Sequence, residues 1–434
     1  MNKKHIKDRN LIFMLLMLMV LPLGAICPLS NAEKNEDTFK RIDRTLEMQR
    51  ESLFELHRDL HSHPELSGNE ERTAQVITDR LRALGLEVRS GVGGHGVIGL
   101  LVGGKPGPVV AYRADMDAVH SDAPDPVPYR SQTPGVRHIC GHDVHTTVAV
   151  GIAEALASLQ EVLPGTVKFI FQPSEENAQG AKAMIDDGAM QNPVPDAIFA
   201  VHSAPLEVGQ FGTTEGMLLA GLDILNVILS GKGDLRSAAR ASAKVISGVS
   251  TVGSMGGAQG VVEASAENSV GNDFILATVY DREENPEIPR ITLRVMIRAS
   301  SDKMSEEARR DIQTGLEQLD LAGISHKVEY NQGVVPAVMN DPILARRTME
   351  IIRKLRGEEG LVVIEETTPF FSEDFAFFLQ KIPGVMSFLG VSNTNKGIVG
   401  MPHSPQFAVD EEAIIIGAKT MAAVLWDYLV TKQS

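Results

Sequence analysis

The sequence contains 434 residues, of which 43% are hydrophobic and 22% are charged. This composition is typical of a globular protein of two or three domains, and it excludes a disordered chain, a collagen and a small disulfide-rich scaffold. The formal net charge of −15 opposes binding to nucleic acid or to anionic membranes, because both require a basic surface. We therefore expect neither of them as a partner.

The first 32 residues have the pattern of a secretory signal peptide. A basic N-terminus precedes an apolar run from Leu11 to Ile26, and the segment from Ser30 to Ala32 offers a small-x-small cleavage site. The run is shorter than the ~20 residues that usually cross a bilayer; an uncleaved anchor and a lipid-modified Cys27 are the alternatives. We expect an exported protein, periplasmic or secreted, with no stable membrane association after cleavage.

Removal of this segment would leave Cys140 as the single cysteine of the mature chain. No intramolecular disulfide could then form, so stability must come from the buried core. A free thiol in an oxidising compartment is a liability unless it is buried or bound to a metal. Because His142 and His145 follow Cys140 closely, the metal-bound alternative is favoured here.

Residues 33–221 alternate between helical and β-rich patterns, which predicts the first part of an α/β domain. Helical spacing extends over 37–84 and is interrupted by a turn at His63-Pro64-Glu65. Strands are predicted at 97–102, 109–113, 167–171 and 197–201, and a helix at 146–159. Strands that alternate with helices indicate an α/β sheet with helices on both faces.

Residues 222–332 have a different pattern, which predicts an inserted α+β domain. Strands are expected at 224–229, 274–279 and 291–297, and helices at 238–249 and 305–321. The first pattern returns over 333–434, with helices at 342–355 and 411–429 and a strand at 385–389. We therefore expect the α/β domain to be completed by this C-terminal part.

Several residues of metal-ligand type lie at or near the ends of predicted strands, where open α/β sheets place their sites. Taken singly, each has an ordinary structural explanation, such as a solvated pair of glutamates or a capping aspartate. Together they supply the thiolate, imidazole and carboxylate donors that Zn²⁺ and similar cations accept, and a pair of cations needs five or more. The expected ligands are Cys140, His142, Glu176, His202 and His403.

The adjacent glutamates Glu175 and Glu176 can have different roles, because neighbouring side chains of an extended segment diverge. If Glu176 binds metal, Glu175 can face the metal-activated water and act as the general base. Asp117, which follows the strand at 109–113, is expected either to orient a metal ligand or to cap the strand end. The reaction expected from this set is hydrolysis of a carbonyl compound.

These motifs resemble those of peptidase family M20, in the branch of aminoacylases, hippurate hydrolases and auxin-conjugate hydrolases. The resemblance implies an α/β fold, in which a zinc-peptidase-like catalytic domain with a mixed sheet flanked by helices is interrupted by a smaller α+β lid or dimerisation domain. It also implies two divalent metal ions, zinc or manganese, on the five ligands above, Glu175 as the base, and a homodimer. The matching segments are HRDLHSHPEL from His57, RADMDA from Arg113, CGHDVH from Cys140, QPSEE from Gln172, SEDF from Ser372 and HSPQF from His403.

The inserted domain departs from the family pattern at two places, Leu235 and the segment from Asn285 to Pro289, where the family's substrate-holding Asn-Val-Ile-Pro is degraded. Leu235, in the segment GKGDL from Gly231, stands where the family usually has a histidine that helps to stabilise the oxyanion. Arg298 resembles the family's arginine for the substrate carboxylate. The expected function is an exported amidohydrolase that cleaves N-acyl amino acids or related small amides. The alternatives are a metal-bearing substrate-binding protein with weak or lost catalysis, and a dipeptidase or carboxypeptidase of the same fold.

Overall fold

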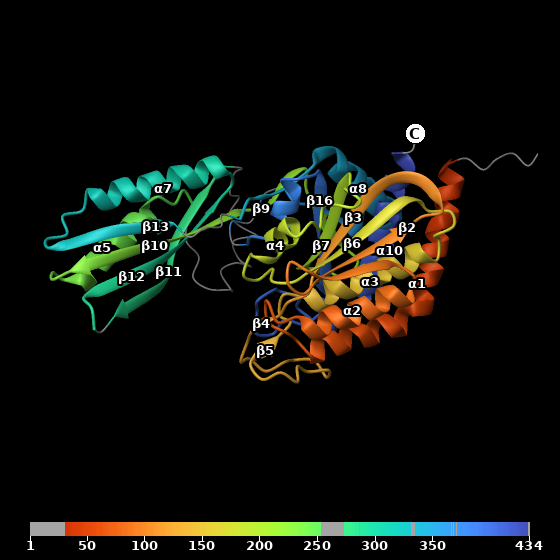
Figure 1. Ribbon diagram of the computed structural model, residues 1–434, viewed down its shortest axis with the longest axis horizontal. Helices are drawn as coiled ribbons and strands as arrows, with labels where there is room; N and C mark the ends of the chain where they lie inside the picture. Colours follow the sequence, from red (N-terminus) through yellow and green to blue (C-terminus); the bar gives the residue numbers. More distant parts are fainter. Residues whose placement is uncertain are drawn as a thin grey trace, which may run out of the picture.

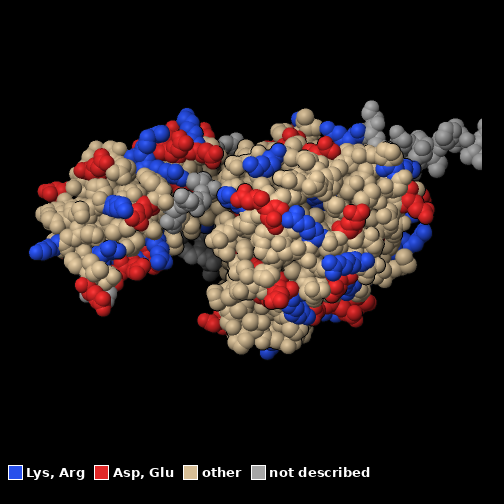
Figure 2. Space-filling model, viewed as in Figure 1, with Lys and Arg blue, Asp and Glu red and all other residues tan. Residues whose placement is uncertain are grey.

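The computed structural model describes residues 31–252, 273–285, 287–330, 335–365, 367, 369 and 371–432. The predicted signal segment lies outside these residues except for its last two positions, where helix α1 (Asn31–Ser62) begins. The predicted domain boundary at residue 332 also lies outside them. The described chain forms a larger and a smaller lobe (Figure 1). Acidic and basic side chains are interspersed over both lobes on the face drawn in Figure 2.

The larger lobe is built on an eight-stranded sheet of order β1-β2-β6-β3-β7-β16-β8-β15. Its central strands run parallel to one another, and they are β6 (Pro164–Gln172), β3 (Lys105–Asp115), β7 (Ala197–Glu207) and β16 (Gly384–Ser392). The outer strands are β1 (Glu87–Val92), β2 (Gly96–Val102), β8 (Phe211–Thr213) and β15 (Leu361–Val363). Because β2 and β8 run antiparallel to their central neighbours, the sheet is mixed, as predicted.

Helices cover both faces of this sheet, which confirms the predicted α/β layers (Figure 1). Successive residues of β3 face opposite cores: Val110 and Tyr112 contact one hydrophobic cluster, and Ala111 contacts the other. The first cluster includes the helices α1, α2 (Glu71–Ala83), α3 (His142–Ala157), α8 (Pro342–Arg356) and α10 (Glu412–Thr431). The second includes the short helices α4 (Gly180–Asp186) and α9 (Ala376–Leu379).

Helix α10 is long and apolar enough to cross a membrane by length and composition alone. However, 83% of its most apolar window is buried inside the protein, where it packs in the same hydrophobic cluster as α1 and α3. Its uniform apolarity is therefore that of a central core helix. Shorter elements complete the larger lobe: β4 (Val119–His120), β5 (Val136–Arg137), β9 (Gly216–Leu219), β14 (Val338–Asn340) and 3₁₀ helices at Glu358–Gly360 and Thr394–Lys396.

The smaller lobe, which we call the lid, is a four-stranded antiparallel sheet with two helices packed on it. Its strands in spatial order are β11 (Ile275–Asn285), β12 (Arg290–Ala299), β10 (Gly221–Gly231) and β13 (Ile324–Tyr330), and its helices are α5 (Leu235–Gly248) and α7 (Asp302–Glu317). An α+β domain therefore interrupts the larger lobe, as the fold prediction stated. Strand β13 was not predicted, because its half-exposed edge sequence ISHKVEY lacks a continuous apolar pattern.

Both connections between the lobes pass through one point. The backbone N–H of Leu222 donates to the carbonyl of Val335 at 2.8 Å, and the N–H of Val335 donates to the carbonyl of Leu222 at 2.7 Å. The chain therefore leaves for the lid and returns from it side by side. This point lies beside the carboxyl ends of the parallel strands, because Leu222 and Val335 line the same cavity as Glu175 and His202.

Candidate active site

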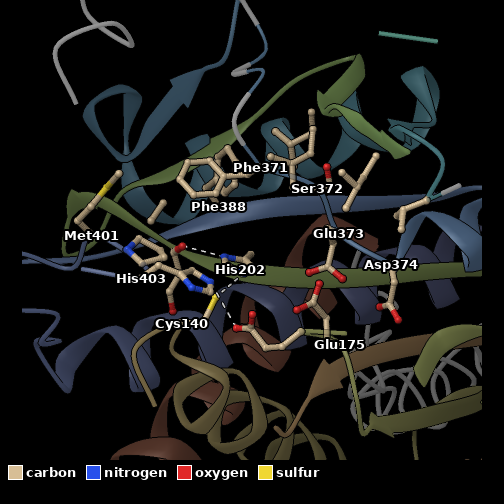
Figure 3. A pocket seen from close by; sticks show the side chains of 18 of the residues that line it. Cys140, Glu175, His202, Phe371, Ser372, Glu373, Asp374, Phe388, Met401 and His403 are labelled. Carbon is tan, nitrogen blue, oxygen red and sulfur yellow. Dashed lines mark hydrogen bonds and ion pairs between the residues drawn. The ribbon is translucent and has the colours of Figure 1, made fainter. Parts of the chain in front are cut away.

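A cavity of about 430 Å³ lies where the parallel strands end and the connections to the lid begin. Residues from the loop after β6, from β7 and from the segments 371–374 and 401–403 form its walls. Figure 3 shows that the side chains of Cys140, Glu175, His202, Glu373 and His403 converge on it. The cavity thus occupies the edge at which open α/β sheets bind ligands.

The structure brings together all five residues that were expected to bind metal, and we call them the cavity cluster: Cys140, His142, Glu176, His202 and His403. The Sγ atom of Cys140 lies 3.4 Å from Nε2 of His202. Nε2 of His403 lies 3.4 Å from Oε1 of Glu176, and Nε2 of His142 lies 3.8 Å from the same oxygen. Donors from distant parts of the chain therefore face one another.

Local backbone features place these donors. Gly141 has a φ of 90° at the N-terminus of α3, and a Cβ atom there would lie 2.4 Å from Oγ of Ser203, so only glycine fits between Cys140 and His142. Ser174 and His403 are non-glycine residues with φ values of 55° and 59°. Left-handed backbone of this kind costs free energy and is often found at functional sites.

The position of His202 corrects one expectation. It was predicted to follow the strand at 197–201, but it lies within β7, which continues to Glu207. The strand is longer because β16 pairs with it as far as Glu207. Nδ1 of His202 donates to the carbonyl of Ser203 at 2.9 Å, so Nε2 is left with a free lone pair toward Cys140. Burial lowers the pKa of His202 well below its usual value and keeps the ring neutral.

The cavity cluster fits divalent cations, because two of its atoms lack a partner among the described residues. Nε2 of His142 and Oε1 of Glu176 are both buried without a hydrogen bond, which is costly unless a ligand completes the site. Two groups of donors lie within 4.8 Å of one another and share Cys140: one adds His142 and His202, the other Glu176 and His403. The arrangement can therefore hold two neighbouring cations.

The thiol of Cys140 depends on such a cation for its ionisation. Burial, together with the nearby carboxylates of Glu176 and Glu175, raises its pKa well above the usual value. Only the thiolate is a strong metal ligand, so binding a cation must release the proton of Cys140.

Asp117 connects His142 of the cavity cluster to the backbone of Glu175 and Glu176. Its Oδ1 accepts hydrogen bonds from Nδ1 of His142 at 3.2 Å and from the backbone N–H of Glu175 at 3.1 Å. Its Oδ2 accepts from the N–H of Glu176 at 3.0 Å and from Oγ of Ser67 at 2.6 Å. One carboxylate thus fixes the tautomer of His142 and the backbone of both glutamates.

His145 contacts the sheet rather than the cavity. Its Nδ1 donates to Oδ1 of Asp115 at 2.6 Å, and its Nε2 accepts from the backbone N–H of Ser203 at 2.7 Å. Both ring nitrogens are therefore engaged, and His145 links α3 to β3 and β7.

Glu175 lies at the centre of the cavity wall, and its side chain is buried. Burial raises its pKa well above the usual value, and the carboxylates of Glu373, Glu176 and Asp374 raise it further. A carboxylate whose pKa is raised in this way is a stronger base than an exposed carboxylate, which suits a group that shuttles protons.

Glu373 and Asp374 received no role from the sequence, although they belong to the SEDF segment. Arg113 holds both of them: its guanidinium donates to Glu373 at 2.9 Å, to Asp374 at 3.1 Å and to Asp115 at 2.5 Å, and all four residues are buried. Arg113 also received no role. The signal that could have found it is an arginine inside a strand that reads as fully buried, since such a charge requires buried acidic partners.

One side of the cavity is apolar. Phe371 and Phe388 lie opposite the polar side chains in Figure 3. Apolar walls with a few convergent polar groups are typical of small-molecule sites. The apolar lining comprises Leu206, Leu218, Leu219, Ile364, Phe371 and Phe388.

The lid residues singled out from the sequence do not line the cavity. Arg298 lies opposite Leu222 and on the same face of the lid sheet, and Leu222 does line it. Nε of Arg298 is buried without a partner among the described residues, and burial lowers the pKa of its guanidinium to about 10. Leu235 begins helix α5 and packs against the core of the lid, after the N-cap Asp234. It therefore offers the cavity no polar group.

A sheet edge of this kind, with clustered metal-type donors beside a buried carboxylate, defines a metal-dependent hydrolase of the α/β class. Residues 111–427 match the model of peptidase family M20/M25/M40. The chain belongs to this family.

Similar proteins support this assignment. The chain is 33% identical over 390 residues to a probable hydrolase of Synechocystis, with 87% of this chain and 95% of that protein covered. It is 33% identical to the IAA-amino acid hydrolase ILR1-like 5 of Arabidopsis thaliana, with 89% of each chain covered. The solved structure of the YXEP protein of Bacillus subtilis, a dinuclear metal-binding peptidase of the M20 family, is 29% identical with a TM-score of 0.70, covering 89% of this chain and 99% of that chain. The protein is a metal-dependent amidohydrolase or peptidase.

Proposed function

We propose that this chain is an exported amidohydrolase that cleaves the amide bond of N-acyl amino acids or related small amides. The observation that carries the proposal is the position of Glu175, a buried carboxylate that lines the same cavity as Cys140, His202 and the apolar wall. In this arrangement a water molecule, a metal-polarised carbonyl and a proton acceptor can meet at one point. The name of the Arabidopsis relative, an IAA-amino acid hydrolase, supports an acyl-amino acid as the substrate class.

Cys140, His142, Glu176, His202 and His403 would hold the cations. A thiolate, imidazoles and a carboxylate suit zinc best and also accept manganese, so we propose two ions of either metal. When bound, such cations polarise a carbonyl and make water acidic enough to attack near neutral pH. Asp117 would keep His142 in the tautomer that presents Nε2 to the cation, because it accepts the hydrogen bond from Nδ1.

Glu175 would move the proton that the reaction requires. It takes a proton from the attacking water while the new C–O bond forms at the carbonyl carbon. It then gives that proton to the amide nitrogen while the C–N bond breaks, so that a carboxylic acid and a free amino acid leave. The raised pKa of Glu175 supports both transfers, since the group can be protonated and deprotonated within one cycle.

The two ends of such a substrate have separate places. The apolar side of the cavity, formed in part by Phe371 and Phe388, can bury an aliphatic or aromatic acyl group. Arg298 on the lid would bind the carboxylate of the amino acid, because its guanidinium is largely buried and Nε has no partner among the described residues.

The decisive experiment is an assay of the purified mature protein, loaded with Zn²⁺ or Mn²⁺, on a panel of acyl-amino acids and dipeptides. We expect metal-dependent release of free amino acid, and Glu175→Gln should lower kcat by ~10²–10⁴-fold without loss of bound metal. Glu71→Gln, at an exposed glutamate of α2, is the matched control and should leave kcat unchanged. Absence of turnover with every compound under either metal would refute the proposal.

A metal-bearing binding protein is the second candidate, and Leu235 is the observation that favours it. The lid offers no imidazole at this position, and losing one oxyanion donor typically costs ~10²–10³-fold in rate. If the unmodified protein shows no activity and ligand affinity survives Glu175→Gln, the binding function is correct.

A dipeptidase or carboxypeptidase is supported by the name of a relative from Saccharolobus solfataricus, thermostable carboxypeptidase 2, which is 31% identical. Relative rates on dipeptides and acyl-amino acids separate it from the first candidate.

Export and assembly complete the proposal. The apolar run from Leu11 to Ile26 supports cleavage near residue 32 and a periplasmic or secreted location. Cell fractionation with N-terminal sequencing tests it, and an intact N-terminus in the cytoplasm would contradict it. We also propose a homodimer through the lid, where a second copy could add to an edge strand of its sheet, β11 or β13. Light scattering coupled to gel filtration measures the mass that decides this.

A further inference from the structure

Glu373 has a free carboxylate oxygen inside the cavity. The residue lines the cavity next to Glu175 and is only 2% exposed. Its Oε1 accepts hydrogen bonds from Nη2 of Arg113 at 2.9 Å and from the backbone N–H of Phe375 at 3.0 Å. Its Oε2 is buried and accepts none from the part of the chain that the structure describes. The carboxylate is therefore fixed through one oxygen and unpartnered at the other.

The adjacent acid, Asp374, has no such unpartnered oxygen. Asp374 is also held by Arg113 and also buried, but both of its oxygens have donors: Oδ1 accepts from Arg113 and Gln172, at 3.1 and 2.7 Å, and Oδ2 accepts from the N–H of Ala181 at 3.0 Å. Leaving a buried carboxylate oxygen without a donor costs free energy. Within this pair of acids, Glu373 alone is arranged to receive a donor from a bound molecule.

The position of Glu175 indicates which donor that is. Figure 3 shows the carboxylates of Glu373 and Glu175 pointing toward each other. Under the proposed function, on which this inference rests, Glu175 delivers a proton to the nitrogen of the scissile amide, so that nitrogen must lie within hydrogen-bond reach of Glu175. The nitrogen of a secondary amide carries one N–H of its own, which needs an acceptor once water has left the cavity.

Other acceptors beside Glu175 are already committed, and Oγ of Ser372, which lines the cavity without a partner among the described residues, lies farther from Glu175 than the carboxylate of Glu373 does in Figure 3. The donor atoms of Cys140, Glu176, His202 and His403 are those proposed for the cations, and Asp374 is satisfied within the protein. Oε2 of Glu373 is left, and it belongs to the carboxylate that points toward Glu175 in Figure 3.

We propose that Glu373 is a further catalytic residue, which accepts the N–H of the scissile amide through Oε2. The contact positions the nitrogen for proton transfer from Glu175. It also strengthens as the nitrogen gains positive charge on leaving, because hydrogen bonds between a carboxylate and a charged donor are stronger than those with a neutral donor. The site thereby selects secondary amides over substrates that lack an N–H at the scissile atom.

A paired-substrate experiment tests this contact. We would measure kcat/KM of the metal-loaded protein and of Glu373→Gln on an N-acyl amino acid and on the matched ester, in which oxygen replaces the scissile N–H. Arg113 can donate only to the oxygen of the new amide, so the NH₂ group of the glutamine would face the substrate N–H and repel it. We expect a ~10–100-fold loss on the amide and a loss below ~3-fold on the ester.

Asp374→Asn is the matched control, because it removes a negative charge beside the same arginine without touching a free oxygen. This variant should lower kcat/KM for the amide and for the ester by the same factor. Equal losses on amide and ester in Glu373→Gln would overturn the inference, whereas failure of the unmodified protein to cleave the amide would instead overturn the proposed function.

A second measurement on the unmodified protein does not depend on the folding of the variant. An N-sulfonyl amino acid keeps an N–H next to a group that water does not cleave, and its N-methyl derivative lacks that N–H. We expect the N-methyl compound to inhibit at least ~10-fold more weakly. Equal inhibition constants for the two compounds would overturn the inference.

Discussion

Two groups of histidines and acids, all of them buried or partly buried except the exposed His403, meet at the first turn of helix α3. The cavity cluster contributes His142, and the adjacent Asp143 belongs to a second group, which we call the helix cluster: His57, His61, Asp125, Asp143 and Glu411. Both clusters place three metal-type donors within 4.8 Å of one another. They nevertheless differ in what their polar atoms contact, and none of the five residues of the helix cluster lines the cavity.

In the helix cluster every imidazole nitrogen has a carboxylate oxygen within 3.3 Å, although Nε2 of His57 makes no hydrogen bond to it. Nδ1 and Nε2 of His61 lie 2.7 and 3.1 Å from oxygens of Asp143 and Asp125. The two nitrogens of His57 lie 3.0 Å from Glu411 and 3.3 Å from Asp143. In the cavity cluster, by contrast, the nearest carboxylates to Nε2 of His142 are 3.8 Å away. The same residue types thus form an internally paired ionic network in one place and an open ligand set in the other.

Removing His61 should have the largest effect of the three changes that probe this comparison. In His61→Ala, the buried carboxylates of Asp125 and Asp143 lose a shared partner, and breaking such a buried pair costs roughly 3–5 kcal/mol of unfolding free energy. Urea unfolding of the metal-free protein measures this loss. Bound metal per chain should stay the same, so loss of a metal ion from the variant would show that the helix cluster is itself a metal site.

The second largest expected effect is on the pH dependence of stability, which should distinguish the helix cluster from the cavity cluster. Burial disfavours the charged imidazole, but hydrogen bonds to Asp125 and Asp143 outweigh it and raise the pKa of His61 from 6.5 to about 9. A raised pKa contributes stability that is complete below pH 6.5 and is lost as the pH rises through about 9. The expected loss is roughly 3 kcal/mol.

Unfolding free energies of the unmodified protein and of His61→Ala, measured between pH 6 and 10, test this. The difference between the two proteins should shrink as the pH rises. A constant difference across this range would contradict the protonated state of His61 in the folded protein.

Asp117→Asn should have the smallest effect, and it acts on the cavity cluster. The asparagine has only one accepting oxygen, so it cannot accept hydrogen bonds from both Nδ1 of His142 and the backbone N–H of Glu176 as the two carboxylate oxygens do. Loss of such an outer contact typically weakens metal binding by ~10–100-fold, or about 1.4–2.7 kcal/mol. Isothermal titration with Zn²⁺ measures it, and His61→Ala is the comparison that should bind normally. Unchanged affinity in Asp117→Asn would leave Asp117 as a strand-end cap.

Much of the site could be predicted because its chemistry is carried by residue types at strand ends. Cys140, Glu176 and His403 were all named from the sequence, and the structure places them around one cavity. Glu373 and Arg113 were given no role: the buried strand indicates that Arg113 needs acidic partners, but nothing local identifies Glu373, 260 residues later in the chain, as one of them. The prediction also ended β7 too early, before His202. The strand continues because it pairs with β16, which lies almost two hundred residues later in the chain.

The sequence by itself determined the alternation of strands and helices, the interruption by the lid and the inventory of metal-type donors, because periodicity and residue chemistry are local properties. Tertiary structure decided which donors remain free. Both ring nitrogens of His61 are paired with carboxylates that packing brings against them, whereas Nε2 of His142 and Oε2 of Glu373 are left without a partner among the described residues. Whether a buried polar atom is satisfied depends on side chains from other elements, and only the packed fold brings those together.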